Sequence, residues 1–244
     1  MYEAVHTHPD GQSTAARQAL TAAEYGYDGV VLRNHGDEAT GTSVGTEVES
    51  AAAAAALAES LDAAIDIVNG IEIRTADPEQ AAGLVGNYRS KRTVVVVPGG
   101  DPAINRFAVE TPAVDVLAHP MRGEGDFNHV LAAAAADNGV RVEFSLRPVL
   151  RERGGSRVRA LADLRKLREL VADADAPFVV SADPRSHLEL RAPRELVALG
   201  ETIGFDVETL RTGLAEWGEL ADRNRTRTDD AFVEPGVRLE GEEP

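Results

Sequence analysis

The chain has 244 residues, with 41 acidic and 25 basic side chains and a formal net charge of −16. This length fits one large domain or two small ones, and such a chain can bury a core without covalent staples. The lack of cysteine excludes disulfides and thiolate metal sites. No signal-peptide pattern opens the sequence, and no apolar run approaches the roughly 20 residues of a membrane span. We therefore expect a cytoplasmic protein with no membrane segment.

The basic residues are almost all of one kind. Only Lys91 and Lys166 are lysine, and the other 23 basic residues are arginine. Abundant surface carboxylates hold water and keep proteins apart in molar salt, where charges are screened over about 3 Å. This composition predicts adaptation to a salt-rich cytoplasm, although an ordinary acidic protein from a GC-rich genome would look similar. If salt explains the acidity, the net charge does not argue against nucleic-acid binding.

Short apolar runs alternate with helical patterns along the whole chain. The predicted strands are Tyr2–His6, Asp28–Leu32, Ile65–Ile73, Thr93–Val97, Val114–Ala118, Val140–Phe144 and Phe178–Ser181. The predicted helices are Ser13–Tyr25, one from a capping box at Thr46 to about Asp62, Pro78–Tyr88, Ala103–Val109, Asp126–Asn138 with Gly139 as its C-cap, Ser156–Asp173, Pro193–Ile203 and Val207–Arg223.

The alternation of strand and helix favours parallel strands joined by right-handed crossovers. Because no GxGxxG fingerprint is present, the pattern predicts an α/β fold, a TIM-like (β/α) barrel of about seven parallel strands ringed by helices. We expect one domain over residues 1–227, which includes the C-terminal helices. Residues 228–244 form an acidic tail, in which six acids oppose Arg238, and this composition predicts disorder.

Most of the histidines follow predicted strands, together with two acidic residues. These residues are His6 and His8 after the first strand, His35 after the second, Glu72 at the third, His119 after the fifth, and Asp183 and His187 after the seventh. Barrel proteins build their sites at this C-terminal rim, and imidazole with carboxylate suits Zn, Mn or Fe. One histidine at a strand end is more often an ordinary core or rim residue. The predicted metal site therefore rests on the joint pattern.

Four short motifs at these strand ends occur in a fixed order. They are His6-Thr7-His8, Asn34-His35, Gly70-Ile71-Glu72 and Ala118-His119-Pro120. This order resembles the polymerase-and-histidinol-phosphatase (PHP) superfamily of metallophosphoesterases, whose closing Asp-x-His motif is matched only in part. Here His187 lies two positions further from Asp183 than the family pattern requires. The resemblance implies a PHP-type barrel with a functional or vestigial site for Zn or Mn.

Segments in the second half narrow this resemblance. They are Val142–Pro148, the helix Arg159–Leu170, Val179–Asp183 and Leu190–Leu196. With the earlier motifs they resemble the archaeal RNase P protein component 3 family, a relative of the PHP group, from about Tyr2 to Gly204. The resemblance implies a subunit of ribonuclease P, whose RNA uses bound Mg²⁺ to remove the 5′ leader of precursor tRNA. It further implies four kinds of partner: RNase P RNA, precursor tRNA, RNase P protein component 2 and other protein subunits.

One segment is strongly basic although the chain as a whole is acidic. Between Arg141 and Arg168, nine basic residues oppose three acidic ones. We expect Arg147, Arg151 and Arg153 to lie in a flexible loop with Gly154 and Gly155, where their guanidinium groups can approach phosphates. The predicted RNA- or partner-binding residues are Arg147, Arg151, Arg153, Arg157, Arg159, Arg165, Lys166 and Arg191. The plainer alternative is a solvated helix face with local ion pairs.

Three functions remain open at this point. An RNase P subunit would have no catalytic residue of its own and would act by electrostatic positioning. A free-standing PHP-type phosphoesterase would activate water on a metal held by the strand-end residues. A plain binding barrel would have no RNA role. Metal analysis with a phosphate-ester assay tests the second function, and accumulation of tRNA precursors after depletion tests the first.

Overall fold

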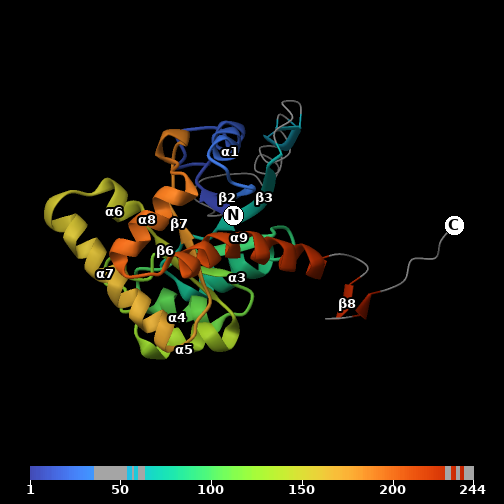
Figure 1. Ribbon diagram of the computed structural model, residues 1–244. Coiled ribbons are helices and arrows are strands. Elements are labelled where there is room, and N and C mark those ends of the chain that lie inside the picture. Colours follow the sequence, from blue (N-terminus) through green and yellow to red (C-terminus); the bar gives the residue numbers. More distant parts are fainter. Residues whose placement is uncertain (36–53, 57, 60–63, 229–231, 235–236, 239–244) are drawn as a thin grey trace.

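The computed structural model describes residues 1–35, 54–56, 58–59, 64–228, 232–234 and 237–238 (Figure 1). Its parallel strands are β1 (Tyr2–Val5), β2 (Gly29–His35), β3 (Asp66–Glu72), β4 (Val94–Pro98), β5 (Val116–Ala118), β6 (Arg141–Ser145) and β7 (Phe178–Ser181). Their order in the sheet is the order in the chain, from β1 to β7. This arrangement confirms the predicted barrel of seven parallel strands.

The two edge strands approach each other and nearly close the sheet. The His6 N–H donates to Pro184 O at 3.0 Å. The Ala182 N–H donates to the Glu3 carboxyl at 3.1 Å. Helix α9 (Val207–Thr228) packs against both β1 and β7. The seam between these strands is therefore held by loop backbone, one buried side chain and a helix.

Helices follow most of the strands and surround the sheet in Figure 1. They are α1 (Ala15–Glu24), α3 (Pro78–Tyr88), α4 (Pro102–Glu110), α5 (His129–Asn138), α6 (Arg147–Arg151), α7 (Gly154–Asp173), α8 (Pro193–Ile203) and α9. The sequence explains several of their ends. The Asp77 and Asp101 side chains cap α3 and α4, and a proline opens each helix. Gly139 ends α5 with φ 65°, which confirms the predicted cap.

The barrel interior changes character along the strands. At its N-terminal end, strand residues form an apolar cluster with Trp217, Leu220 and Ala221 of α9, so this helix closes that end. Strand side chains alternate between faces. Val31 belongs to the apolar cluster, and Arg33 and His35 therefore continue the same inward face. The C-terminal half of the interior is polar and buried.

The strands and most helices lie within a few residues of their predicted positions. β2 continues to His35 rather than ending at Leu32, because its polar residues stay paired with β3 as far as Glu72. α9 extends five residues beyond the predicted Arg223. The predicted helix from Thr46 to Asp62 lies mostly outside the described residues.

Part of the C-terminal segment expected to be disordered carries regular structure. The short strands β8 (Phe232–Glu234) and β9 (Val237–Arg238) pair antiparallel to each other. The domain boundary at residue 227 stays a prediction. Among the described residues, no helix is both long enough and apolar enough to cross a membrane.

Candidate functional site

The polar half of the barrel is centred on the guanidinium of Arg33, which is fully buried. Its Nε and Nη2 lie 2.9 and 2.7 Å from Glu72 Oε2. Its Nη1 lies 2.6 Å from Glu143 Oε1 and 3.2 Å from Asp183 Oδ1. Burial lowers the pKa of Arg33, but the three carboxylates outweigh it and hold the pKa above its ordinary value. One buried cation thus serves three buried carboxylates, and we call these four residues the Arg33 cluster.

Two of these carboxylates are strongly held in the charged form. Burial alone would raise the pKa of Glu72, but Arg33, followed by His6 and Arg74, outweighs burial. Burial also acts to raise the pKa of Asp183, where Arg33 and His119 outweigh it. Both pKa values therefore lie well below the usual range, since opposite charge nearby favours the ionised form.

Histidines lie around the Arg33 cluster on the side of the barrel mouth. His6 Nε2 is 2.5 Å from Asp183 Oδ1, and His119 Nε2 is 3.5 Å from Asp183 Oδ2. His35 Nε2 is 3.7 Å from Glu72 Oε1. Burial lowers the pKa of His35 to about 4, so its imidazole is neutral at neutral pH. Neutral imidazole is the form that ligates metal.

His6, His35 and Glu72 form the group that best fits a metal ion. Each offers a ligand atom within 4.8 Å of the others. His6 Nδ1 and His35 Nε2 are buried and have no hydrogen-bond partner among the described residues. Two imidazoles and a carboxylate suit Zn²⁺ or Mn²⁺. This group, which we call the His–His–Glu group, therefore resembles a metal site.

Two residues at the mouth adopt an uncommon backbone conformation. His119 has φ 49° and Asp183 has φ 52°. Aspartate and histidine enter this left-handed region more readily than most side chains. The conformation follows the ends of β5 and β7, where the chain turns out of the barrel. His119 Nε2 lies 3.5 Å from Asp183 Oδ2, and both residues follow the carboxyl ends of their strands.

Two of the predicted metal-site histidines, His8 and His187, lie outside both the His–His–Glu group and the Arg33 cluster. His6 is buried and His8 is exposed, since β1 ends at Val5 and the expected alternation does not continue beyond it. His187 lies in the short 3₁₀ helix η2 (His187–Glu189), and its Nδ1 is 2.8 Å from Ser13 Oγ. The structure therefore brings together five of the seven predicted residues. Their role in binding metal stays a prediction.

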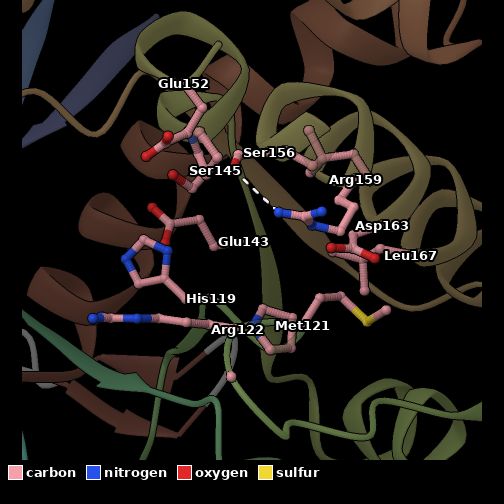
Figure 2. Close-up of a pocket in the computed structure, with 15 residues that line it drawn as sticks. His119, Met121, Arg122, Glu143, Ser145, Glu152, Ser156, Arg159, Asp163 and Leu167 are labelled. Atoms are coloured by element: carbon pink, nitrogen blue, oxygen red, sulfur yellow. Dashed lines mark hydrogen bonds between the residues drawn. The ribbon is translucent and has the colours of Figure 1, made fainter. Parts of the chain in front are cut away.

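A cavity of about 560 Å³ opens beside the Arg33 cluster (Figure 2). His119, Arg122 and Glu143 line its barrel side, and Arg159 and Leu167 of α7 line the opposite side. A second cavity of about 280 Å³ shares several of these residues. Arginines line the two cavities, and they are Arg122, Arg147, Arg151, Arg159 and Arg185. Carboxylates also line the larger cavity, so the excess of positive charge lies at the smaller one, where four arginines face Glu152 and Asp183.

Arg147 and Arg151 were expected in a loop with Gly154 and Gly155, and the structure corrects this expectation because all four residues lie in helices. Arg147 and Arg151 form the ends of α6, whose Val149 is buried and whose first turn contains Pro148. Proline favours the first turn of a helix, and the buried valine anchors that turn. Arg147 pairs with Glu189, and Arg151 Nε lies 3.7 Å from the same carboxylate.

The N-terminal half of α7 extends beyond the barrel core at one side of the molecule (Figure 1). All residues from 151 to 159 are exposed, and the buried residues of α7 begin only at Leu164. Arg153, Arg157 and Arg159 have no ion-pair partner within the part of the chain that the structure describes. We call these three residues the α7 arginines. Their charge remains available to an anionic partner.

The remaining predicted binding residues differ in their surroundings. Arg165 donates to Thr202 O at 2.9 Å, and Lys166 is exposed on the same helix. Arg191, just after η2, donates to Leu190 O at 2.7 Å. The backbone contacts fix the direction of the Arg165 and Arg191 side chains, and neither forms an ion pair with a residue that the structure describes.

Sequence reasoning missed the residues that organise the interior. Arg33 and Glu143 were not among the candidates, although both are charged residues within buried strands. The spacing of Val31, Arg33 and His35 at alternate positions was the available signal. Arg74 was also missed, and it links Glu72 Oε1 and Asp10 Oδ2 at 2.7 Å each.

The family of the chain is shown by comparison with known proteins. A family model described as RNase P subunit p30 matches residues 1–229. Ribonuclease P protein component 3 from Haloarcula marismortui is 63% identical over 240 residues, which cover 98% of this chain and 97% of that protein. The chain belongs to this family. This p30-family chain is thus a protein subunit of ribonuclease P, the endoribonuclease that processes tRNA 5′ ends.

Solved structures agree with the resemblance to RNase P protein component 3 and with the resemblance to the PHP superfamily. A chain in the cryo-EM structure of archaeal ribonuclease P with mature tRNA has a TM-score of 0.82 and 25% identity, with full coverage of both chains. Histidinol phosphate phosphatase from Lactococcus lactis, solved with zinc, L-histidinol and phosphate, has a TM-score of 0.59 and 10% identity. The match covers 84% of this chain and 94% of that chain. The p30-family barrel therefore shares its fold with a PHP-type phosphatase.

Proposed function

We propose that this subunit assists ribonuclease P by binding RNA through the α7 arginines, without supplying a catalytic residue. The observation that carries the proposal is three exposed guanidinium groups without ion-pair partners in the described structure of a chain with a net charge of −16. Guanidinium groups bind phosphate oxygens in pairs, and phosphate contacts orient a protein on RNA without reading its sequence. Hydrolysis then belongs to the RNA subunit and its Mg²⁺.

The partners that follow from this role are RNase P RNA and precursor tRNA, in the cytoplasm. A structural relative comes from archaeal ribonuclease P with mature tRNA, which supports both RNA partners. RNase P protein component 2 is the protein partner that the family resemblance implies, and other protein subunits complete the particle. Co-purification in molar KCl with this chain as bait would test each partner separately.

The experiment is reconstitution of the holoenzyme with the α7 arginines changed to alanine. Loss of three phosphate contacts should lower kcat/KM for precursor tRNA by about tenfold or more, and reduce the salt slope of RNA binding by about 2. Arg147 and Arg151 are left unchanged, because they also pair with Glu189. Unfolding temperature should stay at the wild-type value, since the changed side chains are exposed.

The matched control changes three exposed arginines on other helices, Arg17, Arg106 and Arg211, to alanine. This variant removes the same charge but leaves the basic segment intact, so its activity should remain close to wild type. Equal activity losses in the two variants would point to net charge rather than to the α7 arginines. Unchanged processing by the α7 variant would count against the proposal.

A second candidate rests on the His–His–Glu group and the cavity beside it. Its donor set fits one Zn²⁺ or Mn²⁺, which would join the carboxyl ends of β1, β2 and β3. A free-standing phosphoesterase would use such an ion to supply activated water. Turnover of a simple phosphate ester by the purified chain with Mn²⁺ would favour this function, and metal content without turnover would indicate a vestigial, stabilising ion.

A further inference from the structure

The Arg33 cluster holds its buried charges inside the barrel mouth. Glu72, Glu143 and Asp183 are buried, and one carboxylate oxygen of each lies within 3.2 Å of one guanidinium. Burying a carboxylate without compensation is strongly unfavourable, and three together would also repel one another. A barrel with these residues therefore needs a cation at this position. The cation can be a bound metal or a side chain.

The residue of β3 that pairs with Arg33 is a glycine, which has no side chain of its own. In the register of β2 and β3, the strand partner of Arg33 is Gly70, on the same face of the sheet. A Cβ at Gly70 would lie 2.7 Å from Leu32 O, so this position excludes a side chain beside the guanidinium. The Gly70-Ile71-Glu72 motif thus puts no side chain at the strand partner of Arg33 and supplies the carboxylate that contacts its guanidinium.

The carboxylate atoms that face Arg33 are also used by other donors. Glu143 Oε1 accepts from Ser181 Oγ at 2.7 Å in addition to Arg33. Asp183 Oδ1 contacts both His6 and Arg33, and Asp183 Oδ2 accepts from Ser145 Oγ at 3.3 Å. A metal ion could bind Glu143 Oε1 and Asp183 Oδ1 only by displacing the guanidinium, because Arg33 Nη1 already contacts both oxygens.

We infer that Arg33 is the resident cation of this barrel and takes the place of a metal ion at Glu143 and Asp183. The cluster then divides into two parts. Arg33 neutralises the part formed by Glu143 and Asp183 and also contacts Glu72 Oε2. The His–His–Glu group remains able to take a single divalent ion through Glu72 Oε1, the oxygen that faces His35. Asp183, predicted from its motif as a metal ligand, is instead an ion-pair partner of Arg33. The barrel binds at most one divalent ion and folds without a second.

The test compares the wild-type protein with Arg33→Met in molar KCl, measuring bound Mn²⁺ per chain and the unfolding temperature with EDTA or Mn²⁺. Wild type should bind at most one Mn²⁺. Arg33→Met should unfold about 10 °C lower in EDTA, because three buried carboxylates lose their cation. With Mn²⁺ it should bind one ion more than wild type and recover at least half of that loss.

Arg89→Met is the matched control. Arg89 is a partly buried arginine that pairs with the buried Asp115 and also donates to backbone oxygens, outside the Arg33 cluster. Its removal should lower the unfolding temperature without creating a Mn²⁺ site. The inference is overturned if wild type binds two or more Mn²⁺, or if Arg33→Met gains neither Mn²⁺ binding nor Mn²⁺-dependent stability beyond that of Arg89→Met.

A folding failure of Arg33→Met still leaves decisive measurements. The Mn²⁺ content of wild type stands alone as a test, since a second bound ion contradicts the inference whatever the variant does. Adding Glu143→Gln to Arg33→Met removes one uncompensated charge and should restore folding in EDTA. If the double variant folds no better than the single one, charge compensation is not what Arg33 supplies.

Discussion

Two charged regions of this molecule contrast sharply, the Arg33 cluster inside the barrel and the α7 arginines outside it. In the cluster, one guanidinium contacts carboxylates from two strands and from the residues after a third, with every atom buried. On α7, three guanidinium groups lie in a fully exposed stretch, with no ion-pair partner in the described part of the chain.

The contrast shows how one residue type serves two purposes in one chain. A buried guanidinium must be paired with carboxylates, so its charge is neutralised within the fold. An exposed guanidinium costs little to leave unmatched, and its charge can attract phosphate at a distance. Removing a charge should therefore affect folding in the first region and RNA binding in the second. The following changes test that division.

The largest effect on stability is expected for Glu143→Ala, which removes one carboxylate of the Arg33 cluster. Removing this side chain takes away the 2.6 Å contact of Arg33 Nη1 and the acceptor of the buried Ser181 hydroxyl, and the free energy of unfolding should fall by about 4 kcal/mol. Urea unfolding in molar KCl measures the change. Glu152→Ala is the control, because Glu152 lines the same cavity but is exposed. A loss for Glu143→Ala no larger than for Glu152→Ala would contradict the distinction.

A smaller, pH-dependent effect is expected for Glu3, a buried carboxyl that pairs with no arginine of the described residues. Burial raises its pKa to about 8, despite hydrogen bonds from Ala182, Tyr27 and Ala4. Its ordinary value is 4.5, so the folded protein holds this proton more tightly than the unfolded chain. The associated stability is complete below the ordinary pKa and is lost as pH rises towards the folded-state pKa.

Glu3→Gln should therefore be less sensitive to rising pH than wild type. Between about pH 5 and pH 8, wild type should lose about 3 kcal/mol more of its free energy of unfolding than the variant. Urea unfolding at both pH values measures this difference. Parallel pH profiles would show that Glu3 does not bind its proton as tightly as its burial implies, and would weaken the comparison with the arginine-paired carboxylates.

The smallest effect is expected for Arg147→Ala, at the boundary between the two regions. Arg147 pairs with Glu189 and donates to Asp183 O at 3.1 Å, and it is partly exposed. Its loss should lower the free energy of unfolding by about 1 kcal/mol, as for a partly solvated ion pair with a backbone contact. Holoenzyme activity should fall less than with the α7 arginines removed. An equal fall in activity would indicate that the RNA-binding surface includes α6.

Local sequence patterns determined much of this fold. Alternating apolar runs and helical stretches predicted the seven parallel strands, because each strand must bury both faces between helices and barrel interior. Gly139 was predicted to end α5 and does so, and α3 and α4 begin within one residue of their predicted starts. Histidines at strand ends were predicted to meet because parallel strands end at one rim, and His6, His35 and His119 do lie around the Arg33 cluster.

Tertiary structure alone decided how the charges are used. Whether Arg33 is buried depends on strands β3 and β6 and the residues after β7, which bring carboxylates from positions 72, 143 and 183 to one point. Local sequence does not encode such distant contacts. For the same reason α6 was predicted as a loop, since its arginines are held by Glu189, a residue far along the chain. The sequence alone determined where charges occur, and the closed barrel determined which of them are neutralised.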